Sequence, residues 1–119
     1  MILGVGIDLI EVQRVARVME KPRFLQRIYT EGERERIARK GAESAAGYFA
    51  AKEAAMKALG VGMAVPFASI GVVNDARGKP SVEFTGKSKE LADKMGVRRA
   101  HVSISHSKEQ AVAVVILED

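Results

Sequence analysis

One segment, residues 47–60, constrains the fold of this chain more than any other. It consists mainly of Ala, Lys, Glu, Met and Leu, which are strong helix formers, and it ends in Gly60, a residue type that commonly terminates helices. Its apolar residues can form one stripe along such a helix: Phe49, Ala50, Met56 and Leu59. We therefore expect a long helix with one buried face, around which the other elements pack.

Glu53 and Lys57 lie four residues apart in this segment, so their side chains share one face of the expected helix. For an isolated pair of this kind, the favoured interpretation is a surface ion pair that contributes about 0.3–0.5 kcal/mol. A role in binding or catalysis needs support from elsewhere in the sequence.

Length and composition indicate one globular domain over residues 1–119. No apolar run approaches the ~20 residues that a transmembrane helix needs. The run from Met1 to Ile7 has no basic region and is followed directly by Asp8, so it does not resemble a secretory signal. The chain has no cysteine, which excludes disulfides and thiolate metal sites. We expect a cytoplasmic protein that does not bind membranes.

The formal net charge of +4 and the basic isoelectric point near 9.6 favour an anionic partner. Positive charge is concentrated in residues 12–28, where Glu20 is the single acid among these basic residues: Arg14, Arg17, Lys21, Arg23 and Arg27. This pattern suits a polyanion or an acidic protein surface. A small basic nucleic-acid-binding module is one such interpretation, although the chain lacks tryptophan and has few aromatic residues for base stacking.

The chain opens with an expected strand from Met1 to Ile7, in which alternate residues face opposite sides. Leu3, Val5 and Ile7 share one face, whereas Gly4, Gly6 and Asp8 share the other. Glycines leave the backbone bare, so a ligand or another chain could approach that face. Taken alone, the segment from Asp8 to Glu11 fits a capping box, and this local pattern favours Asp8 as a helix N-cap.

The remaining elements predict an α+β fold with a largely antiparallel sheet. Helices are expected from about Ile10 to Glu20, from a capping box at Thr30 and Glu33 onward, and over 87–95. Strands are expected at 70–74, 80–84, 100–106 and 111–117. The last strand is apolar on both faces, so it should be central or covered by another subunit.

Several motifs together resemble the 4′-phosphopantetheinyl transferase superfamily, in particular its short holo-[acyl-carrier-protein] synthase type. They follow one another in the family's order: Gly6-Ile7-Asp8-Leu9-Ile10-Glu11, Arg14, Thr30 with Glu33, Phe49-Ala50-Ala51-Lys52-Glu53-Ala54, Lys57-Ala58-Leu59-Gly60, Arg77-Gly78-Lys79-Pro80 and Ser103-Ile104-Ser105-His106-Ser107. The resemblance covers nearly the whole chain. It implies an enzyme that moves 4′-phosphopantetheine from coenzyme A to a serine of apo acyl carrier protein, with Mg²⁺ as cofactor and adenosine 3′,5′-bisphosphate as product.

By this resemblance, Asp8 and Glu53 are the Mg²⁺ ligands and belong to the catalytic site. Their type suits the metal, since Mg²⁺ typically takes one or two carboxylates, several waters and substrate phosphate oxygens. Lys57 would contact phosphate, and it is also the candidate to accept or relay the serine proton. Because an unperturbed lysine is protonated at neutral pH, with a pKa of about 10.4, the proton role needs a lowered pKa or a water relay.

The resemblance also implies residues that contact coenzyme A and the carrier. The expected coenzyme A contacts are Lys52, Gly62 in the glycine turn after the helix, Lys79, Pro80 and His106. The expected carrier contacts are Arg14, Arg17 and Lys21, since the recognition helix of the carrier is typically acidic. The family resemblance further implies a homotrimer with active sites between subunits.

Two positions depart from the family pattern. Many relatives carry a basic residue where this chain has Tyr48, and a threonine often stands where Val61 lies between two glycines. Neither departure affects Asp8 or Glu53.

Overall fold

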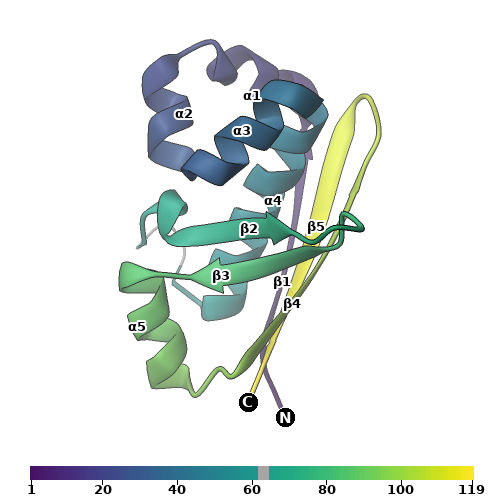
Figure 1. Cartoon of the computed structure of the whole chain (residues 1–119). Coiled ribbons are helices and arrows are strands. Elements are labelled where there is room, and N and C mark those ends of the chain that lie inside the picture. Colours follow the sequence, from purple (N-terminus) through teal and green to yellow (C-terminus); the bar gives the residue numbers. More distant parts are fainter. Residues whose placement is uncertain (62–64) are drawn as a thin grey trace.

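The computed structural model describes residues 1–61 and 65–119. Helices and strands alternate irregularly along the chain, as an α+β fold predicts (Figure 1). The elements are β1 (Ile2–Glu11), α1 (Val12–Met19), α2 (Pro22–Ile28), α3 (Glu31–Lys40), α4 (Ala42–Leu59), the 3-10 helix η1 (Phe67–Ser69), β2 (Ile70–Asn74), β3 (Pro80–Phe84), α5 (Gly86–Met95), β4 (Arg99–His106) and β5 (Gln110–Glu118).

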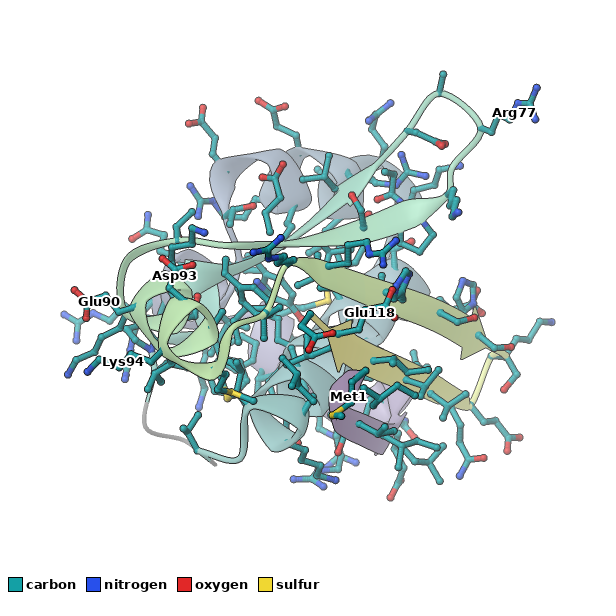
Figure 2. The ribbon with its side chains drawn as sticks, turned by 90° about the horizontal axis from the view of Figure 1, so that it is seen from below. Met1, Arg77, Glu90, Asp93, Lys94 and Glu118 are labelled. Atoms are coloured by element: carbon teal, nitrogen blue, oxygen red, sulfur yellow. The ribbon has the colours of Figure 1, made fainter. Side chains whose placement is uncertain are left out.

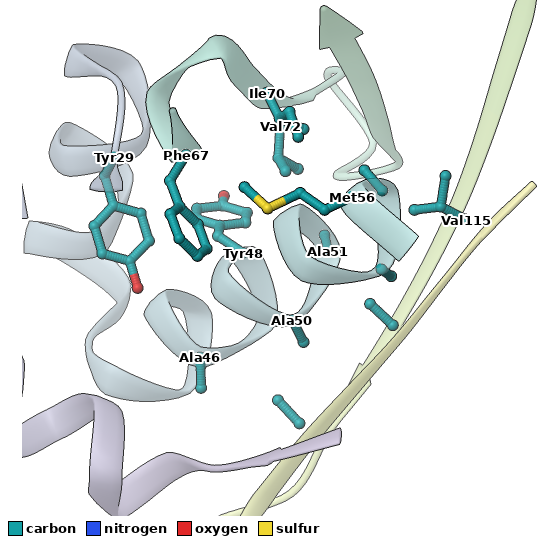
Figure 3. Packing of buried hydrophobic residues seen from close by; sticks show 14 of the residues in the cluster. Tyr29, Ala46, Tyr48, Ala50, Ala51, Met56, Phe67, Ile70, Val72 and Val115 are labelled. Atoms are coloured by element: carbon teal, nitrogen blue, oxygen red, sulfur yellow. The ribbon is translucent and has the colours of Figure 1, made fainter. Parts of the chain in front are cut away.

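Helix α4 lies at the centre of the fold, as its composition predicts. It ends at Gly60, which adopts the left-handed conformation with φ of 75°. Burial extends around most of the helix rather than along one stripe, because the sheet, α1, α3 and β2 all contact it. Figure 3 shows Met56 of α4 close to Ile70 and Val72, with Val115 of β5 packing from the sheet side. The many alanines of α4 allow these elements to approach closely.

Two antiparallel sheets accompany this helix. Strands β1, β5 and β4 form one sheet in that order, and β2 pairs with β3 in the other. The doubly apolar strand β5 is therefore central, as its sequence predicts. Its inner residues are buried against α4, whereas Val112, Val114 and Ile116 on the outer face are only partly covered. The expected α+β class with antiparallel pairing is confirmed.

Strand β1 continues past Asp8 to Glu11, so the prediction that Asp8 caps a helix is wrong. Asp8 lies opposite Ala113 in the ladder with β5, and α1 begins four residues later with Glu11 at its N-cap and no side-chain cap. Strand β5 is long enough to pair with β1 up to Glu11. The backbone groups that a cap would satisfy are therefore bonded within the sheet.

The glycine face of β1 is occupied by α4. A Cβ atom on Gly4 would overlap the carbonyl oxygen of Ala58, and one on Gly6 would overlap that of Ala54. The expectation that a ligand or another chain approaches this face is wrong, because the helix backbone of the same chain fills it. The opposite face remains open, with Val5, Ile7 and Leu9 57–60% exposed.

A buried ion pair joins α3 to α4 and to the start of β2. Glu33 accepts hydrogen bonds from Thr30 N, which completes the expected capping box, and from Val72 N. Lys52 Nζ lies 2.7 Å from Glu33 Oε1 and donates to the carbonyl oxygens of Phe67 and Ile70. Burial lowers the pKa of Lys52, and the negative charge of Glu33 opposes this effect.

None of the helices in the described part of the chain has the length and hydrophobicity that a membrane span requires.

Candidate active site

The carboxylates of Asp8 and Glu53 lie in the same hollow, although they come from different elements. Asp8 points inward from β1 and is 9% exposed, while Glu53 projects from α4 and is partly buried. The hollow has a volume of about 400 Å³, and Arg14 of α1 also lines it. We call it the carboxylate hollow. Its remaining wall is apolar: Leu9, Ile10, Val15, Val18, Phe24 and Phe49.

The two acids interact electrostatically. The pKa of Glu53 is raised, chiefly by burial and then by the negative charge of Asp8 and a hydrogen bond with it. The positive charges of Lys57 and Arg14 act in the opposite direction. Two carboxyl groups held this closely favour sharing a proton or binding a cation.

Lys57 lies one turn beyond Glu53 and pairs with Asp8. Its Nζ atom donates to Asp8 Oδ1 at 3.3 Å and to the carbonyl oxygen of Ile7 at 2.9 Å. The side chain is 56% exposed, so its ammonium group is reachable from solvent. The carboxylate that Lys57 pairs with is therefore Asp8 rather than Glu53, which differs from the simple surface pair expected from the spacing.

The expected coenzyme A contacts His106 and Pro80 lie together in a second hollow of about 180 Å³. We call it the β4-edge groove. It also includes residues from α3, α4, β2 and the β2–β3 turn: Arg36, Ser44, Gly47, Tyr48, Asn74, Gly78 and Ile104. His106 ends β4, and its Nδ1 atom lies 3.5 Å from Glu43 Oε2.

Lys79 lies in the exposed turn that joins β2 to β3. The side chain of Asp75 accepts hydrogen bonds from the backbone nitrogens of Arg77 and Lys79, which fixes the turn. Arg77 stands at the tip of this hairpin, away from the body of the protein (Figure 2). The role expected for Lys79 stays a prediction, and Gly62 lies outside the described residues.

The prediction that Lys52 contacts a nucleotide is wrong. Lys52 is fully buried, and its ammonium group is bonded to Glu33 and to two backbone carbonyls. Helix α3 and the segment from η1 to β2 cover this side of α4. The sequence predicts an exposed position for Lys52 only if α4 buries a single apolar stripe, whereas α4 is buried around most of its circumference.

The three expected carrier contacts are exposed on and just beyond α1. Arg14 differs from Arg17 and Lys21 because it also lines the carboxylate hollow. Arg17 lies in the last turn of α1, and Lys21 precedes α2. A partner that contacts all three residues would approach the entrance to the carboxylate hollow.

The chain matches known proteins over its whole length. Residues 4–115 match the family model described as the 4′-phosphopantetheinyl transferase superfamily. A holo-[acyl-carrier-protein] synthase from Koribacter versatilis is 47% identical, with all of both chains covered. The chain belongs to the 4′-phosphopantetheinyl transferase superfamily, within its holo-[acyl-carrier-protein] synthase family.

Solved structures of holo-[acyl-carrier-protein] synthases share the fold. One from Bacillus anthracis, in complex with CoA (3′,5′-ADP), is 42% identical with a TM-score of 0.84, covering 100% of this chain and 98% of that one. One from Helicobacter pylori, in complex with coenzyme A, is 32% identical with a TM-score of 0.85, covering 96% and 99%. Membership of this transferase family replaces the alternative of a small nucleic-acid-binding module.

Two parts of the site were not predicted for this synthase from its sequence. Phe24 of α2 stacks on Phe49 with ring centroids 6.3 Å apart, and both rings line the carboxylate hollow. Helix α2 was not expected, since the sequence predicts a helix only up to about Glu20, whereas Pro22 occupies the first turn of a new helix. Arg36 was missed because α3 is rich in charge, and spacing alone does not identify which arginine faces the groove.

Proposed function

We propose that the protein transfers the 4′-phosphopantetheine group of coenzyme A to a serine hydroxyl of apo acyl carrier protein. The serine oxygen forms a bond to the phosphorus nearer the pantetheine, and the bond from that phosphorus to the bridging oxygen of the diphosphate breaks. Adenosine 3′,5′-bisphosphate leaves, and the serine proton passes to a base or to water. The observation that carries this proposal is the paired Asp8 and Glu53 with Lys57 beside them.

The donor set of the carboxylate hollow fits Mg²⁺. The described residues contain no cluster of three or more His, Cys, Asp or Glu side chains that could enclose a metal, but Mg²⁺ needs only one or two carboxylates. Asp8 and Glu53 would hold it. The pKa of Glu53 is raised chiefly by burial and then by the negative charge of Asp8, and a cation would offset that charge. When bound, Mg²⁺ neutralises charge on the diphosphate.

Lys57 and Arg14 supply positive charge around the same hollow. Phosphoryl transfer requires mainly positioning and neutralisation of the phosphate oxygens, and both side chains can contribute. Lys57 donates hydrogen bonds to Asp8 and to Ile7, so in this arrangement it acts as a charged donor. This supports its phosphate role. A proton role would require Lys57 to lose a proton first.

The proposed substrate would have to contact both hollows, although they lie apart in one chain. The carboxylate hollow lies at the β1 edge of the sheet and the β4-edge groove lies at the other edge, with β5 between them. A ring of subunits in which the β1 edge of one meets the β4 edge of the next would join them into one site. We propose such a ring, and the number three follows from the family resemblance.

The outer face of the sheet supports this assembly. Val5, Ile7 and Leu9 are well exposed, and they lie beside Val112, Val114 and Ile116 of β5. A contiguous apolar face of this kind marks an interaction surface. Contact between copies of the chain would cover it.

Intact mass spectrometry tests the activity directly. The protein is incubated with coenzyme A, Mg²⁺ and apo acyl carrier protein, and the carrier should gain the mass of one phosphopantetheine. Chelation of Mg²⁺ should stop the reaction, and added Mg²⁺ should restore it. Glu53→Gln should be inactive at ordinary Mg²⁺ while remaining folded, and full activity of this variant would overturn the metal assignment.

The carrier surface can be tested separately. Arg17→Glu with Lys21→Glu should raise the KM for the carrier and leave the KM for coenzyme A nearly unchanged, because charges at a rim mainly steer association. Arg14 is left intact since it lines the carboxylate hollow. Equal changes in both KM values would argue against a carrier-docking role.

A further inference from the structure

A charged pair lies in the interior of the protein, and the proposed reaction has not used it. The side chains of Lys52 and Glu33 are both 0% exposed, and Lys52 Nζ lies 2.7 Å from Glu33 Oε1. Replacing a buried ion pair by well-packed apolar residues is often neutral or stabilising. Stability alone therefore does not account for a pair at this position, and its contacts have to be considered.

The pair joins helices α3 and α4 to η1 and β2. Glu33 Oε2 accepts a hydrogen bond from Val72 N at 2.6 Å. Lys52 Nζ donates to Phe67 O at 3.2 Å and to Ile70 O. Because hydrogen bonds are directional, these contacts fix the rotation of α4 about its own axis as well as its distance from α3 and β2.

The contact of α4 with β1 fixes this rotation less well. Where β1 crosses the helix, Gly4 lies against the backbone of Ala58, and Gly6 lies against that of Ala54. Short residues also make up much of the buried surface of α4: Ala45, Ala46, Ala50, Ala51, Ala54, Ala55 and Ala58 (Figure 3). Such surfaces approach closely, but they lack the long side chains whose interlocking specifies one orientation.

The rotation of α4 determines where Glu53 lies. Glu53 directly follows Lys52, so it projects about 100° further around the helix, and it lines the carboxylate hollow. Since helix side chains reach about 5–6 Å from the helix axis, a rotation of about 10° moves the Glu53 carboxylate by about 1 Å. Asp8 belongs to β1 and would not move with it.

Lys52 also supports the aromatic wall of the same hollow. The ring of Phe67, whose carbonyl accepts from Lys52, stacks on Phe49 with centroids 5.2 Å apart. Phe49 in turn stacks on Phe24, and these last two rings line the hollow. One buried ammonium group is thus connected to both the acid and the wall of the site.

We propose that Lys52, paired with Glu33, is a positioning residue of the active site. It sets the rotation of α4 so that Glu53 and Asp8 face the same hollow. This inference rests on the proposed function. Lys52 touches neither substrate nor metal, because it is enclosed by α3, η1 and β2, and it acts through the helix that carries Glu53.

The test removes both charges together. Lys52→Met combined with Glu33→Gln, the neutral-pair variant, approximately keeps the lengths of both side chains and leaves no unpaired charge in the interior. Circular dichroism should show a folded protein. Its kcat at saturating substrates and Mg²⁺ should fall by about 10-fold to 100-fold, because a displacement of about 1 Å can cost that much.

Binding of Mn²⁺ to the protein alone gives a readout that does not depend on transfer. Mn²⁺ accepts the same oxygen ligands as Mg²⁺, and electron paramagnetic resonance measures its binding. The neutral-pair variant should bind Mn²⁺ about 10-fold more weakly than the unmodified protein, as expected when the support of a metal site is lost. A merely structural role of Lys52 would lower the Tm but leave the Mn²⁺ affinity of the folded protein unchanged.

Ser88→Ala is the matched control. Ser88 is fully buried, and its hydroxyl bonds to Ser69 O at 2.6 Å, so it connects η1 to α5 rather than to α4. Its kcat and Mn²⁺ affinity should stay within about twofold of the unmodified values.

If the neutral-pair variant does not fold, Glu33→Gln alone decides the question. Its amide has one acceptor oxygen, so it cannot accept from Lys52 and from Val72 N at the two positions that Glu33 occupies. Both kcat and Mn²⁺ affinity should then fall by about threefold or more, the range of one lost hydrogen bond. Unchanged values would contradict the proposal.

Two results for the folded neutral-pair variant would overturn the inference. One is unchanged kcat and Mn²⁺ affinity, and the other is a lower kcat with unchanged Mn²⁺ affinity, because Lys52 would then act elsewhere than on Glu53. The transfer assay on the unmodified protein separates these failures from failure of the proposed function. If the unmodified protein modifies the carrier and Mn²⁺ affinity does not depend on the pair, only the role of Lys52 is wrong.

Discussion

Glu53 and Asp8 line the same hollow and interact electrostatically, so a carboxyl from the middle of α4 and one from β1 behave as a single electrostatic unit. The pair lies against the apolar wall of the carboxylate hollow, where burial disfavours the ionised form. The pairing depends on how β1 packs against α4, because each element supplies one of the two acids. Gly4 and Gly6 allow β1 to lie directly on α4, which places Asp8 beside Glu53.

The raised pKa of Glu53 predicts a change in stability with pH. The folded state holds the Glu53 proton more tightly than the unfolded state does, so this contribution to stability is present below the ordinary pKa of 4.5 and is lost as pH rises through the raised value. At neutral pH and without Mg²⁺, Glu53→Gln should therefore raise the Tm, although it should abolish transfer. Thermal unfolding monitored by circular dichroism in a chelator measures this. A lower Tm for Glu53→Gln at neutral pH would mean that Glu53 stabilises the fold.

The hydrogen bonds of Lys57 predict how its substitutions rank. Lys57→Arg keeps a permanent positive charge near Asp8, whereas Lys57→Ala removes it. If Lys57 neutralises phosphate, Lys57→Arg should keep a larger share of kcat than Lys57→Ala. Steady-state kinetics with coenzyme A measure both variants. An equal, near-complete loss with normal binding of coenzyme A would instead assign the proton to Lys57, because arginine does not deprotonate.

The contact between β1 and α4 predicts a large cost for a single added methyl group. In Gly6→Ala the new Cβ would overlap the backbone of Ala54, which neither element can avoid without moving. We expect a loss of about 3 kcal/mol or more in the free energy of unfolding. Gly32→Ala is the matched control, because a Cβ there meets nothing within 4 Å and a helix favours Ala by about 1 kcal/mol. Urea denaturation measures both, and similar stability of the two variants would contradict the close contact.

Local sequence patterns predicted most elements of the fold but not how the elements face one another. The capping box at Thr30, the hairpin strands and the glycine end of α4 depend on nearby residues, and the structure confirms them. The face that β1 buries was the opposite of what its apolar residues suggest, because α4 requires the small glycines. Lys52 was misplaced for a similar reason, since its partner Glu33 lies on another helix. Pairing of Asp8 with Glu53 was available only from the family resemblance.

The position of the two hollows at opposite edges of the sheet predicts a specific pattern of complementation. Asp8 and Glu53 come from one chain, so mixing Asp8→Asn with Glu53→Gln should restore no activity. Glu53→Gln damages the carboxylate hollow, whereas Arg36→Gln combined with His106→Ala damages the β4-edge groove. When these two proteins exchange subunits at equal amounts, about one quarter of the sites between subunits should contain two intact halves.

Intact mass spectrometry of the carrier reports the recovered activity at limiting coenzyme A, and native mass spectrometry reports subunit exchange and the number of subunits. Recovery in the second mixture and none in the first would indicate that each site combines the carboxylate hollow of one subunit with the β4-edge groove of its neighbour. Exchange without recovery would contradict shared sites, because intact halves would then be present at the interfaces without forming a working site. A fully active monomer at micromolar concentration would contradict the ring itself, since one chain would then join both hollows across β5.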